Sequence, residues 1–391
     1  MTTAAMAELT LAPTVLRWAR ETYGLELLEA ADVLGVSTAT LEAWEAGELT
    51  PSLPELRAMA DRYKRQLATL LMARPPTVDE PRVADLRRRS DFTPPRLTPG
   101  MHMALRTARR QQLTLARLIE DAGRLQLASG MVTSNSSPEV TAAEQRSRLD
   151  VTLEDQAGWS NVSAAFRAWR SLLEEQGVLI LQLTFGEEDI RGFSLPDDLV
   201  PTIAINTQDA VAGRTFSLFH EFCHLLLGEG GVCAPSVAMR YPTTSESIER
   251  FCNRFAGAFL VPLDALLGLS EARRLGEMAE LPVESDFRAL RDTFKVSSQV
   301  LWYRLHEAGL VDDQRYRDLW VRWAVQGPPP PRQGGTGRDR AQLSLDMNGR
   351  RFVNAVVEAE YRGHLSFADA IDSVRVRSNE WEHLAALARA E

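Results

Sequence analysis

The sequence predicts a mainly α-helical protein with a small α+β core. Residues 13–72 contain closely spaced short helical patterns that are separated by glycine and proline. The middle of the chain has two apolar runs of strand type, at 178–183 and 202–205, followed by two apolar-periodic helices, at 215–227 and 245–260. With 391 residues, of which 45% are hydrophobic, the chain is long enough for two or three domains.

Composition excludes several classes of protein. The ordinary balance of residues argues against disorder, a fibrous repeat or a disulfide scaffold for most of the chain. A net charge of -9 argues against a wholly basic nucleic-acid coat protein. Three sparse cysteines indicate a reducing compartment, the N-terminus does not resemble a signal peptide, and no apolar run approaches the ~18 residues of a membrane span. We therefore expect a cytoplasmic protein that does not cross a membrane.

Proline, glycine and charge predict where the chain divides. Pro75 and Pro76 end the first helical region, and residues 82–117 carry nine arginines against two aspartates, a net charge of +7. Residues 327–337 combine a run of prolines with a glycine-rich stretch that is typical of a linker. The expected parts are a first helical domain, a basic helical connector, an α+β domain, a Pro/Gly linker and a small helical C-terminal module, at 1–76, 77–139, 140–326, 327–343 and 344–391.

The most specific chemical signal is the segment from His220 to His224, which has the form H-E-x-x-H. On a helix, two histidines four residues apart share a face about 6 Å apart along the axis, so both imidazoles can reach one metal ion. Glu221, between them, is placed to take a proton from a water on that metal. Zinc fits best, because two imidazoles, a carboxylate and water form an open tetrahedral site. The alternative is a buried helix that carries two hydrogen-bonded histidines and no metal.

The next helix offers the third ligand. Glu249 and Asn253 lie one turn apart on one face, so Glu249 is the expected ligand and Asn253 the residue that orients the site. Glu246, one turn earlier, is the alternative ligand. Candidates for stabilising an oxyanion are, by residue type, Tyr241, Tyr303 and Arg304.

These motifs resemble the ImmA/IrrE family of metallo-endopeptidases over residues 165–310. The resemblance rests on Thr202–Asn206, on Arg214 with the H-E-x-x-H helix, and on the pattern from Glu249 to Pro262. It implies a small gluzincin-like α+β domain that hydrolyses peptide bonds, with His220, His224 and Glu249 as Zn²⁺ ligands and Glu221 as the general acid/base. Members of the family commonly act on regulatory proteins such as repressors.

One residue departs from that family pattern. Cys252 stands where the family usually has alanine, and with Cys223 it brings two thiols close to the expected metal. We interpret both as small buried hydrophobic residues rather than as a redox sensor.

The first helical region resembles a phage-repressor (XRE) type helix-turn-helix domain of five helices. A helix over 27–34 ends at Gly35, and Ser37 is the expected N-cap of the next helix, 38–46, which ends at Gly47. From 37 to 48 this second helix has no Lys or Arg but carries Glu42, Glu45 and Glu48, and residues 1–74 have a net charge of -3. Its candidate DNA contacts are Ser37, Thr38 and Thr40. DNA binding by this domain and a role in dimerisation or partner docking both stay open. The basic residues at 82–117 suit either DNA or an acidic partner.

The C-terminal module has a degenerate helix-turn-helix pattern in which Ser366 and Asp369 form an N-terminal cap. The order of the parts resembles fused regulators that serve as antitoxins beside a toxin. The first hypothesis is thus a zinc-dependent endopeptidase that cleaves itself or a partner regulatory protein, and that binds operator DNA or forms a homodimer through its repressor-like domain. The alternative is a non-catalytic antitoxin or transcription regulator whose metal-site domain binds a toxin.

Overall fold

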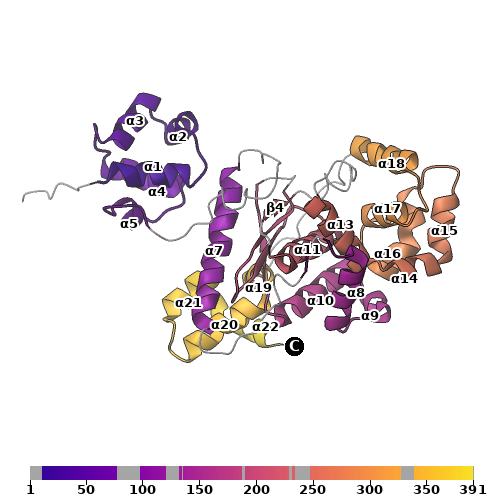
Figure 1. Cartoon of the computed structure of the whole chain (residues 1–391). Helices are drawn as coiled ribbons and strands as arrows, with labels where there is room; N and C mark the ends of the chain where they lie inside the picture. The colour runs from indigo at the N-terminus through magenta and orange to yellow at the C-terminus, as the bar shows by residue number, and fades with distance from the viewer. Residues whose placement is uncertain are drawn as a thin grey trace, which may run out of the picture. The chain divides into compact units, whose positions relative to one another are not determined.

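The computed structural model describes residues 11–76, 97–119, 132–133, 135–186, 190–228, 231–233, 247–326 and 339–390 (Figure 1). The chain forms two compact units. The first consists of Met1–Asp85, Phe92–Thr107 and Phe185–Glu187, and the second of Leu86–Asp91, Ala108–Thr184 and Glu188–Glu391. Among the described residues, none of the helices is both long and apolar enough to cross a membrane.

The first unit begins with five helices, as the sequence predicts: α1 (Pro13–Glu21), α2 (Leu27–Leu34), α3 (Thr38–Ala46), α4 (Leu53–Arg62) and α5 (Leu67–Leu70). Gly35 ends α2 in the left-handed region at φ +71°, and the Ser37 side chain then caps α3 by accepting a hydrogen bond from the Thr40 N–H. The helices enclose a core that includes Leu16, Leu41 and Trp44. Helix α7 (Pro99–Ile119) begins in this unit and ends in the second.

The second unit contains a four-stranded sheet of order β1-β3-β2-β4. Strands β1 (Leu179–Leu183) and β3 (Thr202–Asn206) are parallel, with Leu179 opposite Thr202. Strand β2 (Gly192–Leu195) is antiparallel to β3 and to β4 (Gly231–Cys233). The sequence predicts β1 and β3, whereas β2 and β4 have only four and three residues and no distinct strand pattern of their own.

Helix α11 (Val211–Leu226) is the centre of this unit. It packs against β2 and β3 on one side and against α10 (Val162–Glu175) and α13 (Ser247–Leu260) on others, so that every residue from Thr215 to Leu226 is buried. A helix that is buried on all sides packs its apolar side chains in the core, and its few polar side chains are buried together with them.

Short helices complete the second unit. Before the sheet lie α8 (Pro138–Arg148) and α9 (Leu153–Gly158). After α13 follow α14 (Leu263–Gly268), α15 (Ser270–Glu277), the 3₁₀ turn η1 (Glu284–Phe287), α16 (Arg288–Phe294), α17 (Ser298–Glu307) and α18 (Asp313–Gln326). Their apolar side chains join α11 and α13 in one core. The mainly α protein with an α+β core that the sequence predicts is therefore confirmed.

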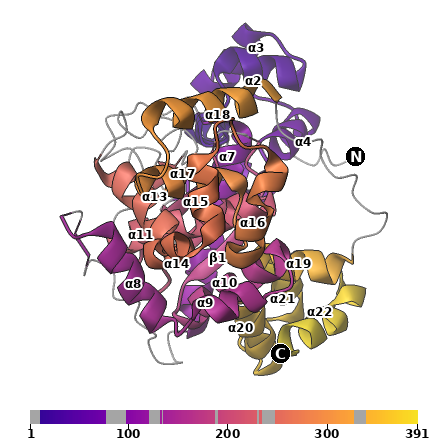
Figure 2. The same ribbon diagram turned by 90° about the vertical axis from the view of Figure 1, so that its right-hand side faces the viewer.

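The C-terminal helices α19 (Arg340–Asn348), α20 (Arg350–Tyr361), α21 (Phe367–Val374) and α22 (Trp381–Arg389), with the 3₁₀ turn η2 (Ser378–Glu380) before α22, lie together in Figure 2. Helix α19 packs along β1, which is an edge strand of the sheet. The Asp346 carbonyl accepts hydrogen bonds from Arg170 (2.5 Å) and from Gln182 (2.8 Å). These contacts connect the C-terminal helices to α10 and to β1.

Candidate metal centre

His220 and His224 lie one turn apart on α11, and their Nε2 atoms are 3.2 Å apart. His220 is fully buried and His224 is 4% exposed. The start of this helix is fixed by Arg214, which donates to the Asp209 carbonyl at 2.8 Å and to Gln182 Oε1 at 3.1 Å. Tying the helix to the loop before it and to β1 gives the two imidazoles a fixed position relative to the sheet.

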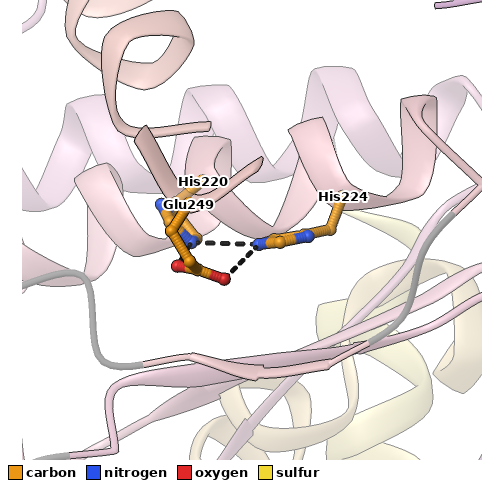
Figure 3. Close-up of side chains that lie close together, drawn as sticks. All are labelled: His220, His224 and Glu249. Carbon is orange, nitrogen blue, oxygen red and sulfur yellow. Dashed lines mark hydrogen bonds and ion pairs between the residues drawn. The ribbon is translucent and has the colours of Figure 1, made fainter. Parts of the chain in front are cut away.

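Glu249, on α13, faces both histidines. One carboxylate oxygen lies 3.3 Å from His220 Nε2 and the other 3.3 Å from His224 Nε2. Figure 3 shows the three side chains pointing toward one another, and their ligand atoms lie within 4.8 Å of one another. Two imidazole nitrogens and a carboxylate oxygen that converge in this way suit zinc. Glu246, the alternative ligand, lies outside the described residues.

Asn253 fixes the orientation of one imidazole. Its Oδ1 lies 3.0 Å from His220 Nδ1, so the ring nitrogen is the donor. With a proton on Nδ1, the Nε2 atom of His220, which faces Glu249 and His224, is the nitrogen that could bind a metal ion. Histidines that bind metals are usually held by such a second hydrogen bond.

The pKa values of Glu249 and His224 depend on each other. Burial acts to raise the pKa of Glu249, but hydrogen bonds from His220 and His224 hold it well below its usual range. For His224, burial lowers the pKa, while the Cys252 thiol and the Glu249 carboxylate raise it to well above its ordinary value. In the metal-free protein these two shifts favour an ion pair between an imidazolium and a carboxylate.

The two thiols near the site are buried. Burial, together with the neighbouring Cys223, raises the pKa of the Cys252 thiol well above its usual value, so the thiol is protonated at neutral pH. Neutral buried thiols pack as small hydrophobic groups, as the sequence analysis predicts.

Glu221 faces the sheet. Its side chain is fully buried against β2, and an ideal Cβ built on Gly192 would lie 3.0 Å from both Cγ and Oε1 of Glu221. Burial raises the pKa of Glu221, the two histidines oppose that rise, and Glu249 adds to it. The site therefore places a fully buried carboxylate beside the two imidazoles.

The sequence alone does not predict that Gly192 and Ser194 lie at the site. Both belong to β2, whose four residues carry no pattern that separates them from a loop. Their proximity to Glu221 follows from the pairing of β2 with β3 and from the packing of α11 on β2, neither of which is local in sequence.

Tyr303 and Arg304, the described candidates for oxyanion stabilisation, make contacts with residues outside the group of His220, His224 and Glu249. The Arg304 guanidinium donates to the Glu139 carboxylate at 2.7 Å and to the Val261 carbonyl at 3.1 Å. Tyr303 is 1% exposed, and its ring lies 3.3 Å from the position of a Cβ on Gly257. Both side chains belong to α17 and pack near the C-terminal end of α13. Tyr241 lies outside the described residues.

In the first unit, Ser37, Thr38 and Thr40 lie at the N-terminal end of α3. The hydroxyls of Ser37 and Thr40 are 2.7 Å apart and belong to the helix cap. Glu45 is buried and paired with Arg20, at 2.7 and 2.8 Å. The other two acidic residues between 37 and 48, Glu42 and Glu48, are exposed.

Comparison with known families agrees with both units. Residues 173–306 match the peptidase M78 family model, described as IrrE N-terminal-like domain, and residues 16–70 match a model described as helix-turn-helix. No curated protein and no solved structure matches the chain significantly. The metal centre, with α11, α13 and the sheet, falls within the first of these matches. The chain therefore combines an N-terminal XRE-type helix-turn-helix domain with an ImmA/IrrE-like domain of the M78 peptidase type.

Proposed function

We propose that the protein is a zinc-dependent endopeptidase that hydrolyses a peptide bond in a regulatory protein, either this chain itself or a partner. The convergence of His220, His224 and Glu249 carries the proposal, because their ligand atoms lie within 4.8 Å of one another beside the buried carboxylate of Glu221. The match to a peptidase family supports the reaction class.

In this proposal His220, His224 and Glu249 hold the zinc ion. When bound, zinc supplies Lewis-acid polarisation of the scissile carbonyl and favours deprotonation of water at neutral pH. Glu221 accepts the proton of the attacking water and then donates it to the nitrogen of the leaving amine. A carboxylate whose pKa is raised by burial suits this role, since it must hold and release a proton near neutral pH.

The test is the variant Glu221→Gln. Purified wild-type protein and this variant should both contain about one zinc per chain, because Glu221 is not among the expected ligands. Cleavage of the chain itself, or of a repressor that co-purifies with it, should fall by at least about 100-fold, which is typical for loss of a general base. His224→Ala should lose both zinc and cleavage.

The alternative function predicts a different result. A non-catalytic antitoxin would co-purify with a toxin and would still neutralise it after Glu221→Gln. Neutralisation that survives this substitution, with no cleavage product from wild-type protein, would exclude the proteolytic mechanism.

For the helix-turn-helix domain we propose operator binding through the N-terminal end of α3, with Ser37, Thr38 and Thr40 facing the major groove, in the cytoplasm and as a homodimer. The internal pairing of Glu45 with Arg20 supports this, because it removes one acidic group from the exposed side of α3. Titration of DNA fragments from around the gene at several salt concentrations tests it. A salt-dependent, sequence-specific affinity is expected.

A further inference from the structure

Helix α11 and strand β2 contribute buried oxygen atoms that are not among the expected metal ligands. Ser194 on β2 and Ser217 and Glu221 on α11 are each fully buried. Within the described part of the chain, neither hydroxyl and neither carboxylate oxygen of Glu221 makes a hydrogen bond. Buried polar groups are nearly always hydrogen-bonded, so this cluster requires an explanation.

The direction of β2 relates one of these hydroxyls to Glu221. Successive side chains of a strand point to opposite faces, so residues 192 and 194 share a face. A Cβ on Gly192 would lie 3.0 Å from Glu221 Cγ and Oε1, which shows that this face is turned toward Glu221. Ser194 therefore presents its hydroxyl on the same side of the strand, next to the carboxylate.

We propose that Ser194 is a positioning residue for Glu221, whose hydroxyl donates a hydrogen bond to the carboxylate and holds it beside the two histidines. The absence of a side chain at Gly192 leaves room for the carboxylate, and the Ser194 hydroxyl, which turns freely about its Cβ–Oγ bond, supplies the donor. The role in catalysis rests on the proposed endopeptidase function, whereas the contact itself does not.

Ser217 provides a matched control on the same helix as Glu221. It lies on α11 one turn before Glu221 and is as buried as Ser194, with its hydroxyl equally unbonded among the described residues. Replacing either serine with alanine removes one buried hydroxyl of the same size.

The contact is tested first without zinc and without substrate. We compare thermal unfolding midpoints of the full chain, after chelation at neutral pH, for Ser194→Ala and Ser217→Ala, each alone and with Glu221→Met. Methionine has a similar length to glutamate but lacks its charge and its hydrogen-bonding oxygens. Ser194→Ala should lower the midpoint by about 2–4 °C more when Glu221 is present than in the Glu221→Met background. The shift caused by Ser217→Ala should be equal in both backgrounds.

The role in catalysis is tested on zinc-loaded protein. Under single-turnover conditions the cleavage rate constant of Ser194→Ala should fall about tenfold at unchanged zinc content, and Ser194→Thr, which keeps the hydroxyl, should recover most of it. Ser217→Ala should leave the rate unchanged.

Two outcomes are distinguishable. Equal midpoint shifts for Ser194→Ala in both backgrounds would overturn the proposal. If instead the shifts differ and wild-type protein cleaves nothing, the contact is supported and the endopeptidase function is wrong.

Discussion

At the scale of single residues, the hydrogen bond between Asn253 and His220 favours one tautomer of a proposed metal ligand. We predict that Asn253→Ala lowers the zinc affinity about 10–100-fold, because the imidazole then loses the partner that directs its Nε2 at the metal. Competition with a chromogenic chelator measures the change. Asn253→Asp is the control, since its carboxylate still accepts from Nδ1 and should keep the affinity within a few-fold of wild type. Equal losses in both variants would contradict the orienting role.

Gly192 has a steric role that no other residue can fill. We predict that Gly192→Ala reduces cleavage by at least about tenfold while zinc content is kept, since the new Cβ would lie 3.0 Å from the Glu221 side chain and 3.3 Å from the Ala204 carbonyl. Gly158→Ala is the matched control, because nothing lies within 4 Å of its added Cβ. The measurement is a cleavage rate beside zinc analysis for both variants. Full activity in Gly192→Ala would show that the carboxylate can move without consequence.

Zinc binding should release protons. In the metal-free protein burial lowers the pKa of His224, but Cys252 and the Glu249 carboxylate raise it well above its ordinary value, which favours the protonated imidazole. A ligand imidazole must be neutral, so the affinity should fall as pH falls, by about tenfold per pH unit for each proton released. It should become constant once the pH exceeds the pKa of His224 in the free protein. Calorimetric titrations in two buffers of different ionisation enthalpy count the protons. Identical heats in both buffers would contradict the ion pair.

At the scale of elements, local patterns explain what the sequence predicts. Both helices of the site, which carry His220 with His224 and Glu249, have strong apolar periodicity. Two residues four positions apart on a helix lie on the same face, so their spacing in the sequence already predicts that they lie close together. Gly192 and Ser194 are different, because their approach to Glu221 depends on pairing between β2 and β3. Such pairing is non-local, and four residues are too few for a period-two pattern to be distinct.

In the helix-turn-helix domain, the sequence likewise does not show which acidic side chains are exposed. Counting residues treats Glu42, Glu45 and Glu48 alike, yet tertiary packing buries Glu45 at 4% exposure against Arg20. Whether an acidic residue on α3 faces a groove or a partner inside the domain depends on where α1 crosses α3, which composition does not contain.

This buried pair predicts a large effect on stability. Glu45→Ala leaves the Arg20 guanidinium buried without its carboxylate and should destabilise residues 11–76 by about 3–5 kcal/mol. Amide hydrogen exchange over those residues reports the change. In Glu48→Ala, where the side chain is exposed, the change should stay within about 0.5 kcal/mol. A small effect for Glu45→Ala would mean that the pair contributes no more than a surface ion pair.

At the scale of the whole molecule, the second unit includes the C-terminal helices as part of its packing. Arg170 and Glu174 form a buried ion pair at 2.8 Å on α10. The same guanidinium also donates to the carbonyls of Asp346 and Ile180, so one side chain connects α10, the edge strand β1 and α19. Covering an edge strand in this way protects its unpaired backbone groups from association with other chains.

Gly349, between α19 and α20, lies directly on this pair. Its φ is +84°, and an added Cβ would lie 2.4 Å from Glu174 Oε1 and 3.1 Å from the Ile180 carbonyl oxygen. Gly349→Ala should therefore separate the C-terminal helices from the ion pair and destabilise their contact with the sheet by about 2–4 kcal/mol. Amide exchange in residues 339–390 and in β1 should accelerate together.

The control for Gly349→Ala is Gly363→Ala. Gly363 also has a left-handed φ, of +75°, but nothing lies within 4 Å of its added Cβ. It thus shares the positive φ but lacks the collision, whereas Gly349 also has a ψ of 152°, in a region that residues with a Cβ strongly avoid. If both variants accelerated exchange only within the C-terminal helices and left β1 unchanged, the ion pair would not couple those helices to the sheet. If Gly349→Ala alone also exposes β1, docking of the C-terminal helices is part of what keeps the edge of the sheet closed.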